Sequence, residues 1–230
     1  MRTAHHSAIR ARHPSERPRL YFVIATMVAC LLVYIVSAVF ALGWIAATVH
    51  AFVMNLIFGV YVLLRRDMLM AALMVFGLVA GFAELFSDHY AIVTGSLVYP
   101  QEGPFLWTSP LYMPFSWAFT FAQLGYLAVY IRQRNGLVLS IIAMAFISGS
   151  SIPIFEYLAK YAEFWHYQNV PMLWSSVPIY VIASEAFLAI SLPFLAARLQ
   201  PEKWALAALL GLIQGAWIYL GLRVALYLLG

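Results

Sequence analysis

Residues 20–64 decide the fold, and they read LYFVIATMVACLLVYIVSAVFALGWIAATVHAFVMNLIFGVYVLL. A helix needs about 20 apolar residues to cross the hydrocarbon core of a bilayer, so this stretch is too long for one crossing. Gly43 marks a tight turn within it, and the Arg-Arg-Asp at 65–67 closes it. The stretch therefore predicts two membrane-spanning helices, roughly 20–40 and 43–64.

The rest of the chain continues this composition. The 230 residues are 64% hydrophobic and 10% charged, with a mean hydropathy of +0.87. Soluble domains are about 45–50% apolar and about 25% charged, so a soluble globular protein and a disordered chain are both excluded. Further apolar segments predict helices at roughly 68–86, 111–131, 137–158, 173–197 and 204–225. The prediction is an all-α integral membrane protein with seven transmembrane helices, with a basic tail (1–19) before a single transmembrane domain (20–230).

The basic residues indicate an orientation. When the predicted helices alternate in direction, eleven of the 13 Lys and Arg residues fall on the side of the N-terminus. They are Arg2, Arg10, Arg12, Arg17, Arg19, Arg65, Arg66, Arg132, Arg134, Arg198 and Lys203. Cytoplasmic loops carry such an excess, so we expect a cytoplasmic N-terminus. This pattern explains the net charge of +4 without a nucleic-acid partner. In a bacterium, the expected location is the cytoplasmic membrane.

The sequence lacks the residues that several kinds of chemistry require. A retinal Schiff base needs a lysine inside the last helix, but Lys160 and Lys203 both lie outside the predicted helices. The nucleotide-binding, zinc-protease and hydrolase signatures are missing from the sequence. A single cysteine and no Cys/His cluster give no zinc site. The sequence predicts no metal and no cofactor.

The acidic residues are the candidates for function. Six of the nine lie in the outer half of the membrane, in outer loops or near mid-membrane. Ionisable groups inside a bilayer normally face a cavity or the bundle interior. Glu84 and Glu156 lie near helix ends, where a solvated position is equally compatible, whereas Glu185 lies near the middle of its predicted helix. Asp88 follows Glu84 at i+4 and shares its face if the helix continues that far; otherwise it is a loop residue. His50 is either an interhelical hydrogen-bonding residue or part of the same site.

Aromatic residues gather on the same side. Trp165 fits the aromatic belt at the membrane interface, whereas Trp117 and Tyr180 lie too far from helix ends for that explanation. Tyr112 and Tyr157 are nearby in the predicted topology. Polar side chains within the helices add to a polar-lined interior: Ser116, Thr120, Gln123 and Gln214. An aromatic-lined pocket suits a long apolar substrate, and aromatic faces stabilise a cation.

Several motifs in residues 80–195 carry a family resemblance. They are Tyr99-Pro100, Gly103-Pro104-Phe105, Pro110-Leu111-Tyr112, Phe115-Ser116-Trp117, Phe155-Glu156-Tyr157, Phe164-Trp165-His166-Tyr167 and Val177-Pro178 through Ser184-Glu185. With the helix count, they resemble the membrane-embedded carotenoid and terpenoid cyclases and hydratases: heterodimer-type lycopene cyclases, carotenoid hydratases and seven-helix meroterpenoid cyclases. The sequence departs from the lycopene cyclase pattern, because Glu185 is single where that pattern has Pro-x-Glu-Glu.

The resemblance implies acid-initiated chemistry without a metal or a redox cofactor. A carboxylic acid protonates a double bond or an epoxide of an isoprenoid, and the resulting tertiary cation closes a ring or is trapped by water. Glu185 is the expected acid, with Glu156 or Glu84 as relay or final base and His50 as another candidate base. The expected partners are a lipophilic isoprenoid substrate and the lipid bilayer, with the aromatic residues around the cation.

Two other classes of function stay open. A transporter or proton-coupled carrier of a small lipophilic solute also uses intramembrane acids, although no internal repeat is visible. A non-enzymatic membrane protein, such as an assembly factor or a sensor, is the third class. The short inner loops leave such a protein little surface for cytoplasmic signalling.

Overall fold

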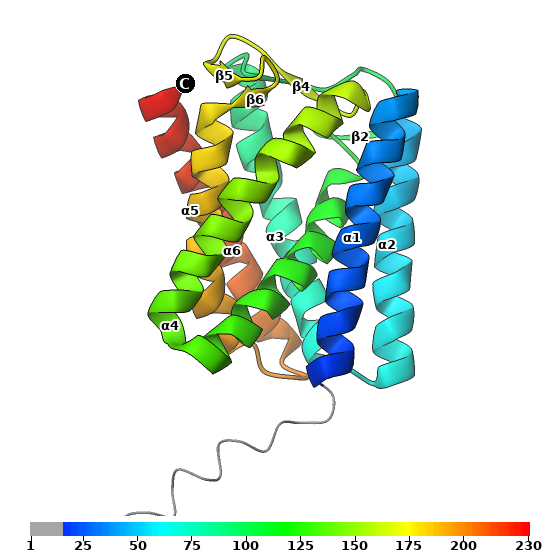
Figure 1. Cartoon of the computed structure of the whole chain (residues 1–230), viewed down its shortest axis with the longest axis vertical. Coiled ribbons are helices and arrows are strands. Elements are labelled where there is room, and N and C mark those ends of the chain that lie inside the picture. Colours follow the sequence, from blue (N-terminus) through cyan, green and yellow to red (C-terminus); the bar gives the residue numbers. More distant parts are fainter. Residues whose placement is uncertain (1–15) are drawn as a thin grey trace, which may run out of the picture.

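The computed structural model describes residues 16–230, and within them six helices are long and apolar enough to cross a membrane. In chain order they are α1 (Glu16–Phe40), α2 (Gly43–Arg65), α3 (Met68–Val93), α4 (Met113–Tyr161), α5 (Ile179–Leu195) and α6 (Trp204–Leu229). A short 3-10 helix, η2 (Ala196–Arg198), extends α5. The helices form one bundle along the long axis of the molecule (Figure 1). The all-α class is confirmed, and the helices are those of a multi-pass membrane protein.

The helix α4 differs most from the prediction. The sequence predicts two helices with a turn at 132–136, whereas the structure has one element of 49 residues. The backbone is non-helical at Gly136 alone, with φ 80° and ψ 176°, a conformation that is essentially restricted to glycine. Figure 1 shows the chain reversing its direction at the end of the bundle where the label of α4 stands. Residues 113–135 and 137–161 are called the first and second halves of α4.

Three helix ends also differ from the prediction. The helix α1 begins at Glu16, so the end of the predicted tail is helical, and the rest of that tail lies outside the described residues. The helix α3 continues to Val93 instead of ending near 86. The helix α5 begins at Ile179 instead of 173, because Pro178 has extended backbone and lacks the N–H of a helix interior. Glu185 stays close to the middle of α5, as the seventh of its 17 residues.

Three short strand pairs cover the end of the bundle that holds the C-terminus (Figure 1). Strand β1 (Leu97–Val98) pairs with β4 (His166–Tyr167) in antiparallel register. The pairs β2 (Phe105–Leu106) with β3 (Ser109–Pro110) and β5 (Met172–Leu173) with β6 (Val177–Pro178) are antiparallel hairpins. We call residues 94–112 and 162–178 the roof, because they close the bundle at this end.

The opposite end of the bundle is held by ionic contacts. The Arg19 guanidinium donates to Asp67 at 2.6 Å, which links α1 to the start of α3. Asp67 also accepts a hydrogen bond from the Met70 N–H at 3.1 Å and so caps α3. The side chain of Arg134 donates to Glu16 at 3.1 Å. These contacts fix the start of α1 against α3 and α4.

Small residues bring α3 close to two neighbouring helices. A Cβ at Gly77 would lie 2.5 Å from the Ala118 carbonyl oxygen, and a Cβ at Gly81 would lie 2.6 Å from that of Pro114. On the other side, a Cβ at Gly215 of α6 would lie 2.2 Å from the Cβ of Ala83. Small residues allow such close backbone approach in membrane helices. The helix α3 is therefore packed tightly between α4 and α6.

Gly215→Ala is expected to lower the free energy of unfolding by about 1–3 kcal/mol, because the added methyl group overpacks the contact with Ala83. Gly59→Ala is the matched control, since no atom lies within 4 Å of its added Cβ. That control is expected to stabilise by about 0.5–1 kcal/mol through helix propensity alone. Thermal unfolding in detergent measures both variants. Equal midpoints for the two would contradict the close contact between α3 and α6.

Candidate functional site: an acid-rich cavity beneath the roof

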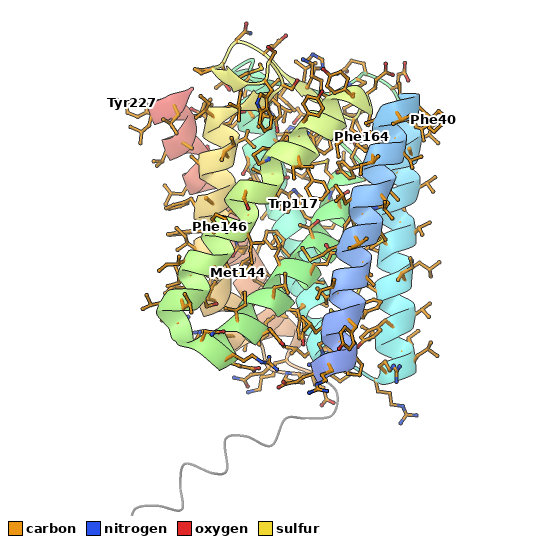
Figure 2. All side chains as sticks on the ribbon, viewed as in Figure 1. Phe40, Trp117, Met144, Phe146, Phe164 and Tyr227 are labelled. Carbon is orange, nitrogen blue, oxygen red and sulfur yellow. The ribbon has the colours of Figure 1, made fainter. Side chains whose placement is uncertain are left out.

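A cavity of about 230 Å3 lies inside the bundle, between α1, α3, both halves of α4 and α5. Its volume exceeds the about 150 Å3 of an engineered cavity that binds benzene, but is below the about 300–1,000 Å3 of most ligand pockets. Four carboxyl side chains line it: Glu84, Asp88, Glu156 and Glu185. Figure 2 shows Trp117, another lining residue, in the space between the two halves of α4.

The first pair of acids stands on α3. Glu84 and Asp88 are one helical turn apart, and both are buried. The Tyr99 hydroxyl, which comes from the roof, donates to Asp88 Oδ2 at 2.8 Å. The close approach of α3 to α4 at Gly81 places Glu84 beside the wall formed by Trp117. Asp88 therefore accepts a hydrogen bond from the Tyr99 hydroxyl, whereas Glu84 faces the cavity beside it.

The other two acids come from facing helices. Glu156 is buried on the second half of α4 and accepts a hydrogen bond of 2.6 Å from the indole N–H of Trp165. Glu185 is partly exposed on α5 and accepts only a long hydrogen bond, 3.5 Å, from the Ser148 hydroxyl. The helices meet at Gly149, where an added Cβ would lie 3.2 Å from the Cβ of Ala186. This contact brings both carboxyl groups to one cavity.

Several buried polar atoms of the cavity wall have no hydrogen-bond partner in the described part of the chain. They are Glu84 Oε2, Ser87 Oγ, His50 Nε2 and Trp117 Nε1. The His50 ring instead packs edge-on against Tyr34 and Phe119, with centroid distances of 5.8 and 5.3 Å. A buried polar group without a partner is costly, and such atoms in a cavity wall are typical of a place where a polar ligand group or water binds.

Two phenols of the roof act as donors. Burial raises the pKa of the Tyr99 phenol, and the neighbouring Asp88 and Glu84 carboxyls raise it further. Burial also raises the pKa of Tyr167, with a further contribution from Glu156. Both hydroxyls therefore keep their protons at neutral pH. The acids of the cavity meet neutral hydrogen-bond donors at the roof.

The structure brings together most of the predicted site. Eight of the ten predicted residues line the cavity: Glu84, Asp88, Glu156, Glu185, His50, Trp117, Trp165 and Tyr180. Tyr112 is a buried residue of the roof and donates to the Phe164 carbonyl oxygen at 3.4 Å, but it does not line the cavity. Tyr157 is 39% exposed on the outer surface of α4 and packs against Tyr161. Neither tyrosine reaches the cavity.

The polar residues within the helices divide in the same way. Ser116, Thr120 and Gln123 line the cavity as one stripe on the first half of α4. Gln214 does not, because its amide oxygen accepts from the Ser191 hydroxyl at 2.6 Å in the contact between α5 and α6. The prediction that Gln214 belongs to the polar interior of a cavity was wrong, and it holds two helices together.

Sequence reasoning missed several polar residues of the wall, among them Tyr34, Tyr99, Tyr167 and Ser148. Tyr34 lies in an apolar run whose nearest polar residue at helical spacing is Ser37, too weak a signal to identify it. Tyr99 and Tyr167 belong to segments that looked like ordinary aromatic loops, and they meet only because β1 pairs with β4. Ser148 stands eight residues before Glu156, on the same face of a helix, and that spacing could have identified it.

The cavity wall carries acids without basic partners. Among residues 16–230, the side chains that line it include neither Lys nor Arg. Within the same range, no three His, Cys, Asp or Glu side chains are arranged so that they could hold a metal ion. The arrangement offers proton donors, proton acceptors and aromatic faces around one apolar space.

The fold and this cavity define a multi-pass α-helical membrane protein with an acid-rich internal site. A family described as a domain of unknown function (DUF6989) matches residues 85–229, which is more than half of the chain, so the protein belongs to this family. Neither a curated protein nor a solved structure matches the chain. The match begins within α3 and includes Asp88, Glu156 and Glu185, whereas His50 and Tyr34 lie before it.

Proposed function

We propose that the protein is a membrane enzyme that cyclises or hydrates a lipophilic isoprenoid, beginning with protonation of a double bond or an epoxide. The observation that carries the proposal is the convergence of four carboxyl groups on one aromatic-lined cavity whose wall has no Lys or Arg among the described residues. Carboxylic acids in such surroundings donate and accept protons, and aromatic faces stabilise the cation that forms between those two steps.

The proposal gives the transferable proton to Glu84. Two carboxyl groups one turn apart and without a cation share a proton more readily than they ionise together. Asp88 accepts from Tyr99, which suits the ionised partner, whereas Glu84 Oε2 is unpartnered and free to meet a substrate. Tyr99, whose hydroxyl donates to Asp88, is the residue of the roof that would pass a replacement proton to this pair.

Glu156 is the proposed final base. It accepts the short hydrogen bond from Trp165 as a carboxylate does, and it lies on the wall formed by the second half of α4. After Glu84 has delivered its proton to carbon, the tertiary cation closes a ring and loses a proton from an adjacent carbon to Glu156, which gives an isomer of the substrate. If water attacks the cation instead, the oxygen loses its extra proton to the same base.

Glu185 keeps the role of a second acid. The sequence favoured it as donor because of its place near the middle of a helix, and it lies near the middle of α5 as well, but it is partly exposed and already accepts a hydrogen bond from the Ser148 hydroxyl. His50, with its unpartnered Nε2, is an alternative acceptor at the far wall. Trp117, Trp165 and Tyr180 supply aromatic faces around the reacting carbon atoms.

We further propose seven membrane crossings with a cytoplasmic N-terminus. At about 1.5 Å per residue, the 49 residues of α4 extend about 74 Å, more than twice the about 30 Å of the hydrocarbon core. The reversal at Gly136 divides this length into two crossings. The basic residues Arg65, Arg134 and Lys203 then lie on the side where α1 begins, as expected for the cytoplasmic side.

Co-expression in hosts that make linear carotenoids or polyprenyl compounds, followed by mass analysis, tests the function. A cyclase gives a product isomeric with its substrate, and a hydratase gives a product heavier by one water. The matched control is the Glu84→Gln variant in the same hosts. If no product forms in any host, while proteoliposomes take up a proton or a solute, the carrier function replaces the enzyme function.

A further inference from the structure

The roof closes the cavity toward the outer aqueous side. Three of its residues, Tyr99, Tyr112 and Phe164, form a buried layer, and each is 3% exposed or less. Strands β1 and β4 pair above this layer, and the Gln168 N–H donates to the Ser96 carbonyl oxygen at 3.1 Å. A ligand that comes from water would have to open this paired and buried layer.

The side of the cavity between α1 and the second half of α4 is less closed. Lining residues on both facing helices are partly exposed: Met27 and Tyr34 on α1, and Ser151, Ile152 and Phe155 on α4. The back wall behind them, which includes Thr120 on the first half of α4, is partly exposed as well. These residues stand next to exposed residues of the same helices, among them Val28 on α1 and Ile154 on α4, so the cavity comes close to the outer surface of the bundle here.

This lateral opening has definite limits. Toward the roof, the Tyr34 ring packs edge-on against Phe155 and Phe164, with centroid distances of 5.1 and 5.3 Å. From that contact α1 and the second half of α4 diverge toward the opposite end of the bundle (Figure 1). Toward that end, the Gln123 amide donates to the Thr26 hydroxyl at 3.1 Å and joins α1 to the first half of α4.

The helix surfaces that flank the opening are apolar. Val28 and Leu32 are exposed on α1, and Phe146 and Ile154 are exposed on α4. Such a belt faces hydrocarbon and not water. The opening therefore lies at the level of the lipid chains.

We propose that the ligand of this site is an elongated apolar molecule dissolved in the bilayer, and that its reactive end enters sideways between α1 and the second half of α4. The cavity of about 230 Å3 holds one end of such a molecule, and the remainder stays in the opening or among the lipids. This inference rests on the proposed function only in taking the acid-rich cavity as the site; it does not depend on the reaction.

The test uses a lipid chain as the probe. A bimane fluorophore is attached to Thr120→Cys in a Cys30→Ser background, and the full chain is reconstituted with a phospholipid that carries a nitroxide in the middle of one acyl chain. The nitroxide is expected to quench the fluorophore, whereas iodide in the water is not. Ser151→Trp, which narrows the opening, is expected to reduce the quenching by about half or more, since a side chain of that size fills much of a small cavity.

Ser150→Trp is the matched control, because Ser150 is exposed beside Ser151 but does not line the cavity. It is expected to leave the quenching unchanged. Efficient quenching by iodide would overturn the proposal. Equal quenching by the nitroxide in the Ser151→Trp variant and the Ser150→Trp control would overturn it as well. Because the measurement needs no turnover, an open lateral entrance in a protein without isoprenoid activity would contradict the proposed reaction and leave the entrance standing.

Discussion

Glu84→Gln is expected to lower turnover of the isoprenoid substrate by about 10²- to 10⁴-fold, the usual contribution of a positioned general acid. The amide keeps the size of the side chain but carries no transferable proton. Asp88 and its hydrogen bond from Tyr99 stay in place, so the cavity keeps its shape. The measurement is product formed per folded protein, with the folded amount taken from the thermal unfolding curve.

Glu102→Gln is the control for this variant, because Glu102 is exposed in the roof and does not line the cavity. Its turnover is expected to stay at the level of the unchanged protein. Glu185→Gln is measured beside it and decides between the two acids. Full activity in Glu84→Gln together with none in Glu185→Gln would show that the donor is Glu185, as the sequence suggested.

Glu156→Gln is expected to reduce turnover by about 10²-fold or more and to change the products. Without the final base, loss of a proton from carbon slows more than attack by water, because the protonated oxygen that water forms can give its extra proton to a second water. The share of hydrated product therefore rises relative to the ring-closed isomer. The measurement is the ratio of the two products by mass spectrometry. An unchanged ratio and an unchanged rate would remove Glu156 from the mechanism.

Trp165→Phe tests the same base through its partner. The phenyl ring keeps an aromatic face in the cavity but removes the N–H that donates to Glu156 at 2.6 Å. We expect a change of products in the same direction as for Glu156→Gln, but a smaller loss of rate. Trp174→Phe is the matched control, because Trp174 is exposed in the roof and does not line the cavity.

The sequence predicts this fold well where helices are concerned. Apolar runs of membrane length and the charged segments between them place most helix ends within a few residues, because the cost of burying charge in a bilayer dominates every other term. The sequence-based prediction fails where the backbone angles of a single residue determine the path of the chain. The reversal within α4 needs only Gly136, so the predicted turn of five residues was too long.

The candidate site shows the same division. Acids within apolar helices are rare enough to identify, and the four on the cavity wall were all singled out. The assignment of Asp88 depended on how far α3 continues, and α3 does continue past it. Residues such as Tyr99 and Tyr167 reach the site by strand pairing between distant segments, which local periodicity does not encode. The same limit explains Tyr157, whose neighbour Glu156 is buried while its own ring faces outward.

The hairpin form of α4 gives the cavity a mechanical property. Its two halves are joined at Gly136, and this joint lies far from the proposed entrance, so a small change of angle at the joint produces a large displacement at the entrance. Phe155 is nineteen residues from Gly136 along the second half of α4, which corresponds to about 28 Å at about 1.5 Å per residue. A rotation of about 5° at the joint therefore displaces Phe155 by roughly 2 Å, about the radius of a methyl group. A change in the backbone angles of Gly136 would therefore change the width of the proposed entrance at the other end of the bundle.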